Sequence, residues 1–443
     1  MSISYFPAVI QPFLQTNFLE KAWGKALNAE LVFENIADQE TFPLGVGESV
    51  TKTRRGLIST NSTNPITGLT LNSSQLDSGL AIGSYGLEQY TYGVSRYGLS
   101  MDLDIITDGM GIVKQYATNL MTLAEHAART KDSIVRNKVY DAGMAGNTVV
   151  TATGTTTAVA VDDVRGFQFA YPNGIPTSVS ASNSLVVMIG STNYTVVAVS
   201  AGTIGSGTTP NAIAGTLTLS TAVSASDGTA GSTVLASNAT TIIREGNVAN
   251  WKAIGTLGLS LNMILDGVTY FRANRVPTID GLYNLYCDDY SVRQLFNDPT
   301  VKTLFTSAQW GNSTWGRAVY EAPVAGVRII THNQTLNQTH PTVSGAKIRR
   351  PIMIGGGAVI EGTFANQLGQ QITNSPVSKA EANRVVIAIR APLDRAGSQL
   401  AQSWYSMFGV VVPTDLTTTP ATVATASYAA YKRVLVLEHY TPN

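Results

Sequence analysis

One long apolar stripe, which begins near residue 106, constrains the fold more than any other feature of the sequence. Its first members are spaced alternately four and three residues apart, as on one face of an α-helix. They are Ile106, Met110, Val113, Ala117, Leu120, Ala124 and Ala127. The pattern continues to about Tyr140. A helix of about thirty residues is roughly 50 Å long. The sequence therefore predicts one long helix.

Two pairs of oppositely charged residues fall within this stripe at helical spacing. Glu125 precedes Arg129, and Asp132 precedes Arg136, by four residues each. Acid-before-base pairs at this spacing support an exposed helix face. We therefore expect these charges to lie on a solvated face, with salt bridges at a subunit interface as the alternative.

The stretch QYTYGVSRYGLSMDLDIITDG (residues 89–109), which leads into the helix, alternates apolar and polar residues as a strand does. The phase of the alternation flips once, at Ser95 and Arg96. Such a flip predicts a one-residue bulge, which bends and twists a strand. We expect it to mark the point where a hairpin joins the body of the subunit.

Three aspartates close this stretch. They do not fit a calcium-binding loop, because the fifth position counted from Asp102 is Ile106 instead of an acid. We expect Asp102 and Asp104 to lie on the polar face of the strand. Asp108, or Thr107, is expected to cap the helix by accepting from free backbone N–H groups.

The chain carries few charges. Charged residues make up 13% of it and the formal net charge is zero, whereas the usual charged fraction is about 25%. A low charge indicates that other subunits cover much of the surface. Because phosphate contacts supply most of the affinity for nucleic acid, sequence-specific binding of DNA or RNA is not expected. Non-specific proximity to nucleic acid stays open.

Targeting signals and disulfides are not expected. Cys287 is the one cysteine, so no disulfide can form within the chain. The start, MSISYFPAVIQPFL, has neither a basic segment nor a long apolar run, which argues against a signal peptide. The longest apolar runs, such as VVIAI from Val385, are too short to span a membrane. We expect the protein to be made and kept in a cytoplasm.

Two segments are expected to pack on something distant in the sequence. Residues 1–48 form an N-terminal arm with a loosely helical pattern over 17–34. Residues 49–95 form an extended hairpin whose tip is rich in Asn, Ser, Thr and Gly. Because an isolated two-stranded ribbon is marginal in water, the hairpin should lie on another subunit.

Residues 147–243 differ sharply in composition from the rest. They contain only four charged residues, which are Asp162, Asp163, Arg165 and Asp227. Short strand patterns recur between turn residues, which predicts a small all-β module. Helical patterning resumes in residues 259–274, so we interpret the module as an insertion between two helical segments.

No motif indicates catalysis, a metal or a cofactor. The four histidines, His126, His332, His340 and His439, lack zinc-site spacing. The three glycines at 355–357 have no following Lys and no helix start, so a bulge or a close backbone contact is expected there instead of a phosphate site. The sequence therefore predicts that the protein is not an enzyme.

Five segments, taken in order, resemble those of tailed-bacteriophage major capsid proteins. FPLGVGESVTKTRRGL (42–57) resembles the strand into the family's hairpin, RYGLSMDLDIITD (96–108) its strand-to-helix entry, and EHAARTKDSIVRN (125–137) its long helix. The later segments are VPTIDGLYNLYCDDYSVRQLFNDP (276–299) and APLDRAGSQLAQSWYSMFG (391–409). The sequence of these segments is most similar to the branch typified by the N-four-like podovirus coat proteins.

The resemblance implies an α+β chain with the Hong Kong 97-type capsid fold and an additional small all-β domain. The implied parts are an N-terminal arm (1–48), an extended hairpin or E-loop (49–95), a P-domain strand and spine helix (96–146), the inserted domain (147–246), the A-domain with the remainder of the P-domain (247–400), and closing strands (401–443).

The same resemblance implies a mechanical function. Copies would form hexamers and pentamers that close into an icosahedral shell around double-stranded DNA, assembled in the host bacterial cytoplasm. Portal, scaffolding and decoration proteins would be partners, and no membrane is involved. The interface or lining candidates are Arg54, Arg55, Arg129 and Arg136.

Two alternatives stay open at this point. An encapsulin-type nanocompartment shell has the same fold and would contain protein cargo, but the large β insert and the phage-like segments disfavour it. A secreted β-rich adhesin would explain the module rich in Thr and Ser, but it requires a secretion signal.

Overall fold

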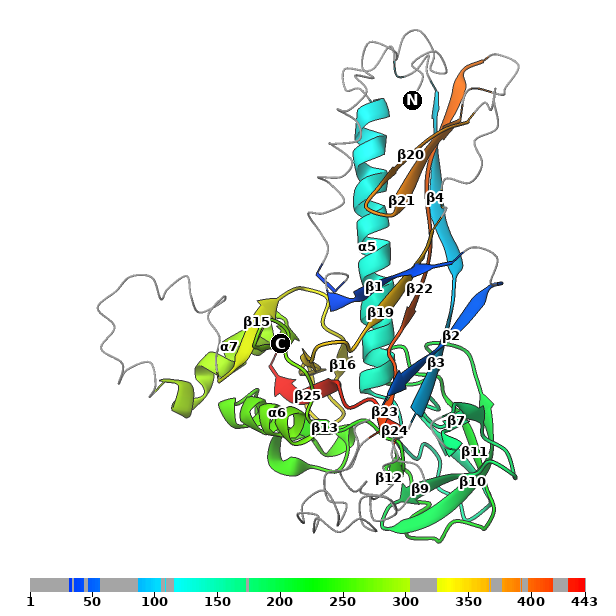
Figure 1. Ribbon diagram of the computed structural model, residues 1–443. Coiled ribbons are helices and arrows are strands. Elements are labelled where there is room, and N and C mark those ends of the chain that lie inside the picture. The colour runs from blue at the N-terminus through cyan, green and yellow to red at the C-terminus, as the bar shows by residue number, and fades with distance from the viewer. Residues whose placement is uncertain are drawn as a thin grey trace, which may run out of the picture. The chain divides into compact units, whose positions relative to one another are not determined.

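The computed structural model shows an α+β chain that divides into two compact units (Figure 1). Unit 1 comprises Met1–Thr51, Thr91–Lys138 and Val359–Val411, and unit 2 comprises Lys52–Tyr90, Val139–Ala358 and Val412–Asn443. The structure describes residues 32–33, 36–43, 47–55, 87–104, 108, 115–172, 175–302, 325–365, 367, 377–390, 392, 397–416 and 429–442. Nearly all of the expected arm helix and the hairpin tip lie outside these ranges.

A six-stranded sheet in unit 1 is centred on the long strand β22 (Gln399–Val411). One edge of β22 pairs with β4 (Ser95–Asp104) in antiparallel register. The other edge pairs first with β21 (Val385–Arg390) and then with β19 (Ile360–Phe364). The outer strands are β1 (Asp38–Phe42) on β19 and β20 (Val377–Ala382) on β21.

Glycine is required where the backbone of β22 meets its neighbours. A Cβ atom on Gly98 would lie 2.6 Å from the carbonyl oxygen of Trp404, and one on Gly409 would collide with the carbonyl of Gly93. These strands can therefore approach closely only without side chains at these two positions.

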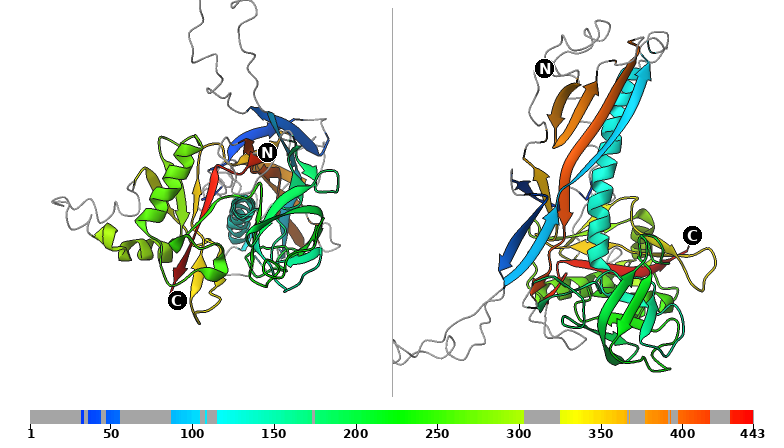
Figure 2. Two further views of the ribbon diagram at one scale, coloured as in Figure 1. Left: turned by 90° about the horizontal axis from the view of Figure 1, so that it is seen from below. Right: turned by 90° about the vertical axis from the view of Figure 1, so that its right-hand side faces the viewer.

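The predicted long helix is present as α5 (Gln115–Gly143). In unit 1 its predicted stripe residues Leu120, Ala124 and Ala127 are buried and pack in one apolar cluster with Trp404 of β22. Small residues on this face let the helix lie close along the sheet, as the right-hand view of Figure 2 shows. Ala117 is exposed, in contrast to the prediction. The start expected near residue 106 lies outside the described residues, apart from Asp108.

The change of phase near Ser95 has a different cause from the expected bulge. Strand β3 (Leu87–Gly93) pairs with β2 (Ser49–Arg55) in a separate two-stranded sheet, whereas β4 pairs with β22. Val94 separates β3 from β4. The predicted bulge at Ser95 and Arg96 is therefore wrong, because the chain leaves one sheet and enters another, which resets the buried face.

Two aspartates of this stretch take the predicted structural places. Asp102 and Asp104 are exposed on β4. Asp108 Oδ1 accepts a hydrogen bond of 2.6 Å from the backbone N–H of Gln115 in α5. Asp108 is itself helical, so its role as the N-cap stays a prediction. Within the described ranges, no three His, Cys, Asp or Glu side chains are grouped so that they could hold a metal ion.

The expected solvated face of α5 is correct for one charge pair and wrong for part of the other. Glu125 and Arg129 are exposed, but Asp132 is fully buried. Asp132 Oδ1 accepts from the backbone N–H groups of Val32 and Phe33 at 2.9 and 2.5 Å. The helix face at Asp132 is thus covered by the segment that precedes β1, which the spacing of charges could not reveal.

Unit 2 contains a seven-stranded mixed sheet centred on β25 (Val434–Thr441). Both faces of β25 are buried, and its first four residues are all apolar. Helix α6 (Leu261–Ala273) begins at the N-cap Ser260 and packs its apolar face in the same core as the sheet. The remaining strands are β13 (Ile242–Arg244), β14 (Tyr283–Cys287), β15 (Val327–Thr331), β16 (Asn337–Thr339), β17 (Lys347–Arg349) and β18 (Ile352–Ile354), with helices α7 (Asp289–Asn297), η5 (Glu245–Asn247) and η6 (Trp251–Ala253).

The predicted all-β module is a six-stranded antiparallel sheet within unit 2. A bridge between Val150 and Val161 joins its two outer strands, so the sheet closes around an aliphatic core. Its strands are β5 (Asn147–Val149), β6 (Ala158–Val161), β9 (Leu185–Ile189), β10 (Thr192–Ala201), β11 (Gly215–Leu219) and β12 (Thr233–Ala236), and β7 (Phe169–Ala170) pairs separately with β8 (Thr177–Ser178).

Two expected boundaries differ from the structure. The module does not extend to residue 246, because β13 pairs with β25 in the other sheet of unit 2. The segment 401–443 is not one closing region either. Residues up to Val411 complete the sheet of unit 1, and those from Val412 return to unit 2. Long-range strand pairing decides both boundaries, and composition does not report it.

We expect Asp132→Ala to lower the free energy of unfolding by roughly 1.5–3 kcal/mol, because it removes a buried charged acceptor of two backbone N–H groups. Chemical denaturation measures this. The exposed Glu125 on the same helix supplies the control, since Glu125→Ala should change stability by less than about 0.5 kcal/mol. Equal effects of the two changes would contradict the assignment of Asp132.

Candidate assembly elements

The ends of β2 and β3 that adjoin the hairpin tip, called the hairpin root below, are held by a compact group of charges in unit 2. Arg54 of β2 contacts both carboxylate oxygens of Asp415, each at 3.2 Å. Arg433 binds the same carboxylate through Nε at 2.7 Å and Nη2 at 3.0 Å. Asp415 is 6% exposed and opens the short strand β23 (Asp415–Leu416), which pairs with β24 (Ala429–Ala430). A buried carboxylate thus ties the hairpin to the C-terminal segment.

The glycine triplet at 355–357 takes part in the same group. The carbonyl oxygen of Gly357 accepts from Arg54 at 2.9 Å, and that of Gly356 accepts from Arg433 at 3.0 Å. A Cβ atom on Gly355 would collide with the side chain of Val276, which confirms the predicted close contact. The two arginines therefore satisfy their donors with one carboxylate and two backbone carbonyls, the fork geometry to which guanidinium is suited.

The four predicted arginines do not form a single cluster within either unit. Arg54 lies in the hairpin root, and Arg55 is exposed at the end of β2. Arg129 is exposed on α5. Arg136 is half-buried and donates from Nε and Nη2 to Asn137 Oδ1 at 3.2 and 3.0 Å. Their role at a subunit interface or lining stays a prediction.

Sequence reasoning missed the partners of Arg54 in this root. Asp415 is 361 positions away in the chain, and Arg433 follows it by another 18. Asp415 stands in the polar run PTDLTTTP, which has no periodicity that would place it beside a hairpin. One signal was available in the sequence. Charged residues are scarce in this chain, so a single Asp in an uncharged run indicates that its carboxylate has a specific partner.

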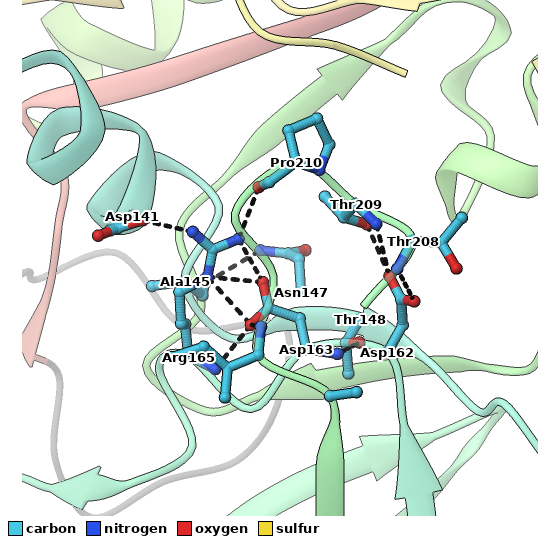
Figure 3. Close-up of polar contacts among 12 residues, drawn as sticks. Asp141, Ala145, Asn147, Thr148, Asp162, Asp163, Arg165, Thr208, Thr209 and Pro210 are labelled. Atoms are coloured by element: carbon cyan, nitrogen blue, oxygen red, sulfur yellow. Dashed lines mark hydrogen bonds and ion pairs between the residues drawn. The ribbon is translucent and has the colours of Figure 1, made fainter. Parts of the chain in front are cut away.

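A second group of charges joins the all-β module to the end of α5 (Figure 3). Arg165 donates from Nε and Nη2 to the carboxylate of Asp163 at 2.6–3.0 Å. Its Nη1 forms an ion pair with Asp141 in the last turn of α5, and Nη2 also reaches the carbonyl of Pro210 at 3.3 Å. Arg165 therefore links the helix, its own turn and a distant loop of the module.

The two ends of the module lie side by side. The N–H of Ala236 donates to the carbonyl of Gly146 at 2.9 Å, and the N–H of Thr240 donates to that of Ala145 at 3.1 Å. Asn147 Nδ2 adds a bond of 2.6 Å to the carbonyl of Thr240. The chain thus leaves and re-enters the rest of unit 2 at neighbouring points.

All four charges of the module are buried. Asp162 accepts from the N–H of Thr208 at 2.6 Å and from the hydroxyl of Thr209 at 2.7 Å. Burial alone would raise the pKa of Asp162, but these bonds outweigh it and lower the pKa. The exposed fractions are 3% for Asp162, 3% for Asp163, 9% for Arg165 and 5% for Asp227. The outer surface of the module therefore carries no formal charge.

A buried Ser–His pair in the core of unit 2 is structural. His439 Nε2 lies 2.9 Å from Ser291 Oγ, and Ser291 donates to Asp288, the N-cap of α7. Both Ser291 and His439 are 0% exposed, so no substrate can reach them. Burial lowers the pKa of His439 to about 4. The imidazole is thus neutral and serves as a hydrogen-bonding spacer between β25 and α7.

No helix among the described residues combines the length and apolar character needed to cross a membrane. The thiol of Cys287 is buried, and burial raises its pKa, so it behaves as a small core residue.

Comparison with known proteins gives structural likenesses only. No protein-family model matches the chain, and no curated protein matches it. Similar solved structures include the capsid of Ralstonia phage GP4, with a TM-score of 0.46, 9% identity, and coverage of 92% of this chain and 88% of that one. The capsid of cyanophage P-SCSP1u gives 0.43, 11%, 92% and 88%, and the capsid of Helicobacter pylori bacteriophage KHP30 gives 0.40, 12%, 93% and 93%.

These structures are phage capsids, the class that the sequence resembles.

We expect Arg165→Ala to destabilise unit 2 by about 3–5 kcal/mol, because it leaves Asp163 buried without its partner. Arg165→Lys should recover only part of this loss, since an ammonium cannot reproduce the fork that spans Asp163 and Asp141. Thermal and chemical unfolding measure the effect. The exposed Arg55 provides the control, and an Arg55→Ala variant as unstable as Arg165→Ala would contradict this account.

The pKa of His439 leads to a pH prediction. Because its folded pKa is below its ordinary value of 6.5, the unfolded chain binds a proton that the folded chain does not between about pH 6.5 and 4. Acidification through this window should cost roughly 3 kcal/mol at this residue. Denaturation of wild type and His439→Gln at several pH values tests this, and an equally steep decline in both would contradict it.

Proposed function

We propose that this chain is the major capsid protein of a tailed double-stranded DNA bacteriophage. Copies form hexamers and pentamers, which close into an icosahedral shell around the genome. The observation that carries the proposal is the rooted hairpin. Strands β2 and β3 pair with each other and with no other strand in the described ranges, yet Arg54, Asp415 and Arg433 hold the ribbon at its tip-side end. Such a ribbon gains stability by lying on another copy.

The parts of the chain correspond to the elements of a Hong Kong 97-type subunit. The β2–β3 ribbon is the E-loop, α5 with the sheet around β22 is the P-domain, and the seven-stranded sheet with α6 and α7 is the A-domain. The closed all-β module is an inserted domain, which is supported by the adjacency of its two ends at Gly146 and Ala236.

The distribution of charge suits a shell lining. Lys131 and Glu361 form a buried ion pair of 3.4 Å inside unit 1, and Arg350 and Glu438 form one of 2.7 Å inside unit 2. Many of the scarce charges are thus used internally. A surface with little net charge would not adhere to packaged DNA, so contact with the genome is non-specific.

The same proposal covers the partners and the location. The subunit works in the virion and assembles in the cytoplasm of the host bacterium, with portal, scaffolding and decoration proteins as partners. Arg55 and Arg129 are exposed, which leaves them accessible for contacts with neighbouring copies, whereas Arg54 acts through the hairpin root.

Assembly tests the function directly. The full-length chain, expressed alone and together with a phage scaffolding protein, is examined by sedimentation and negative-stain microscopy. We expect closed shells of uniform diameter that sediment far faster than a monomer of 46.9 kDa. Only monomers or dimers under both conditions would overturn the proposal. Shells that form but contain protein cargo in place of DNA would point to an encapsulin-type compartment.

Removal of the module should leave assembly intact. We expect shells from a chain in which residues 148–235 are replaced by a short Gly-Ser link, because Asn147 pairs with Leu235, next to Ala236, and β13 is retained. Microscopy and thermal unfolding measure the result. A deletion that extends through Arg244 is the matched control and should prevent folding, since it removes β13 from β25. Failure of both deletions alike would contradict the insertion.

A further inference from the structure

Glu88, in the root of the hairpin, is a buried carboxyl group that no structural network explains. It lies on β3 and is 2% exposed. Neither of its side-chain oxygens has a hydrogen-bond partner. A buried carboxylate normally has two or more partners, because an unpaired buried charge is very costly.

The register of the hairpin places Glu88 opposite Arg54. The N–H of Val94 donates to the carbonyl of Glu48 at 3.1 Å, and the hydroxyls of Thr51 and Thr91 lie 2.8 Å apart. In an antiparallel ribbon, each step forward along one strand is matched by a step back along the other. Three steps on from the pair Thr51 and Thr91, Arg54 therefore lies opposite Glu88. However, the guanidinium of Arg54 is already committed to Asp415 and the carbonyl of Gly357.

The groups that face Glu88 come from four segments. Asp415 of β23 raises the pKa of Glu88 through like-charge repulsion, while the Thr414 side chain, Lys432 and Arg54 lower it. Tyr171 of the module also lies within electrostatic reach, and its hydroxyl is 3.5 Å from that of Tyr431. The nearby cation Arg433 binds Asp415. The root thus gives Asp415 two arginine partners, whereas Glu88 has only the Thr414 side chain and the more distant charges of Lys432 and Arg54 to offset its burial.

We propose that Glu88 is a proton-operated latch: in its protonated form it lets the root of the β2–β3 hairpin seat against β23 and the turn before β25, and loss of the proton loosens that root. An ionised Glu88 would be a desolvated charge beside Asp415, and opening the root would return it to water. The latch acts within a single chain and does not depend on the proposed shell.

The direction of the pH effect follows from the burial of Glu88. Burial first, and then Asp415, raise the pKa of Glu88 from 4.5 to about 8 in the seated root, whereas the opened root restores an ordinary value. Between about pH 5 and 8 the seated form therefore holds a proton that the open form lacks. Opening becomes about tenfold more favourable per pH unit in this window and levels off above it.

Hydrogen–deuterium exchange of the full-length, unassembled chain tests the latch. Mass spectrometry follows peptides that cover β2 and β3, with rates corrected for intrinsic exchange, from pH 5 to 9. In wild type we expect protection of these strands to fall about tenfold per pH unit up to about pH 8 and then to level off. In Glu88→Gln, a nearly isosteric neutral substitute, protection should be high and independent of pH.

Two further variants keep the test decisive. Glu48→Gln makes the same charge change at an exposed residue beside β2, and it should retain the wild-type profile. Thr414→Val removes a group that lowers the pKa of Glu88, so the levelling-off should move to higher pH. A flat wild-type profile, a Glu88→Gln profile as steep as wild type, or an unmoved profile in Thr414→Val would each overturn the latch.

Discussion

The pairing of β22 with β4 is the interaction on which unit 1 depends. Residues 95–104 meet residues 399–408 in continuous register, and the apolar face of α5 packs on the sheet that results. The two strands lie about 300 positions apart, so the sheet forms only after nearly the whole chain is available, and closing so long a loop slows folding. The β2–β3 hairpin and the all-β module do not belong to this sheet, and each is held in place by its own ion pairs.

These ion pairs account for several of the charged residues, which make up only 13% of the chain. Asp415 with its two arginines holds the hairpin root, and Arg165 with Asp163 and Asp141 holds the module. Each is a buried fork of guanidinium and carboxylate at a point where the chain changes direction between elements. Such pairs add geometric specificity more than stability. The outer surface of the module is correspondingly uncharged.

The sequence predicted elements whose signal is local. The stripe of α5 follows directly from residue spacing, and the all-β module follows from short strand patterns between turn residues. The sequence did not predict features that depend on residues distant in the chain. The switch of sheets at Val94, the burial of Asp132 and the root formed by Arg54 with Asp415 all rest on contacts between residues 99 to 361 positions apart or on pairing with a remote strand.

The central claim is that the rooted hairpin serves a neighbouring copy of the chain. A cryo-electron microscopy reconstruction of assembled particles tests it most directly. The account predicts that the β2–β3 hairpin, which Asp415 holds at the tip-side end of β2, lies against the sheet or α5 of an adjacent subunit. A reconstruction in which both strands pack only on their own chain, or in which the copies touch solely through other surfaces, would contradict it.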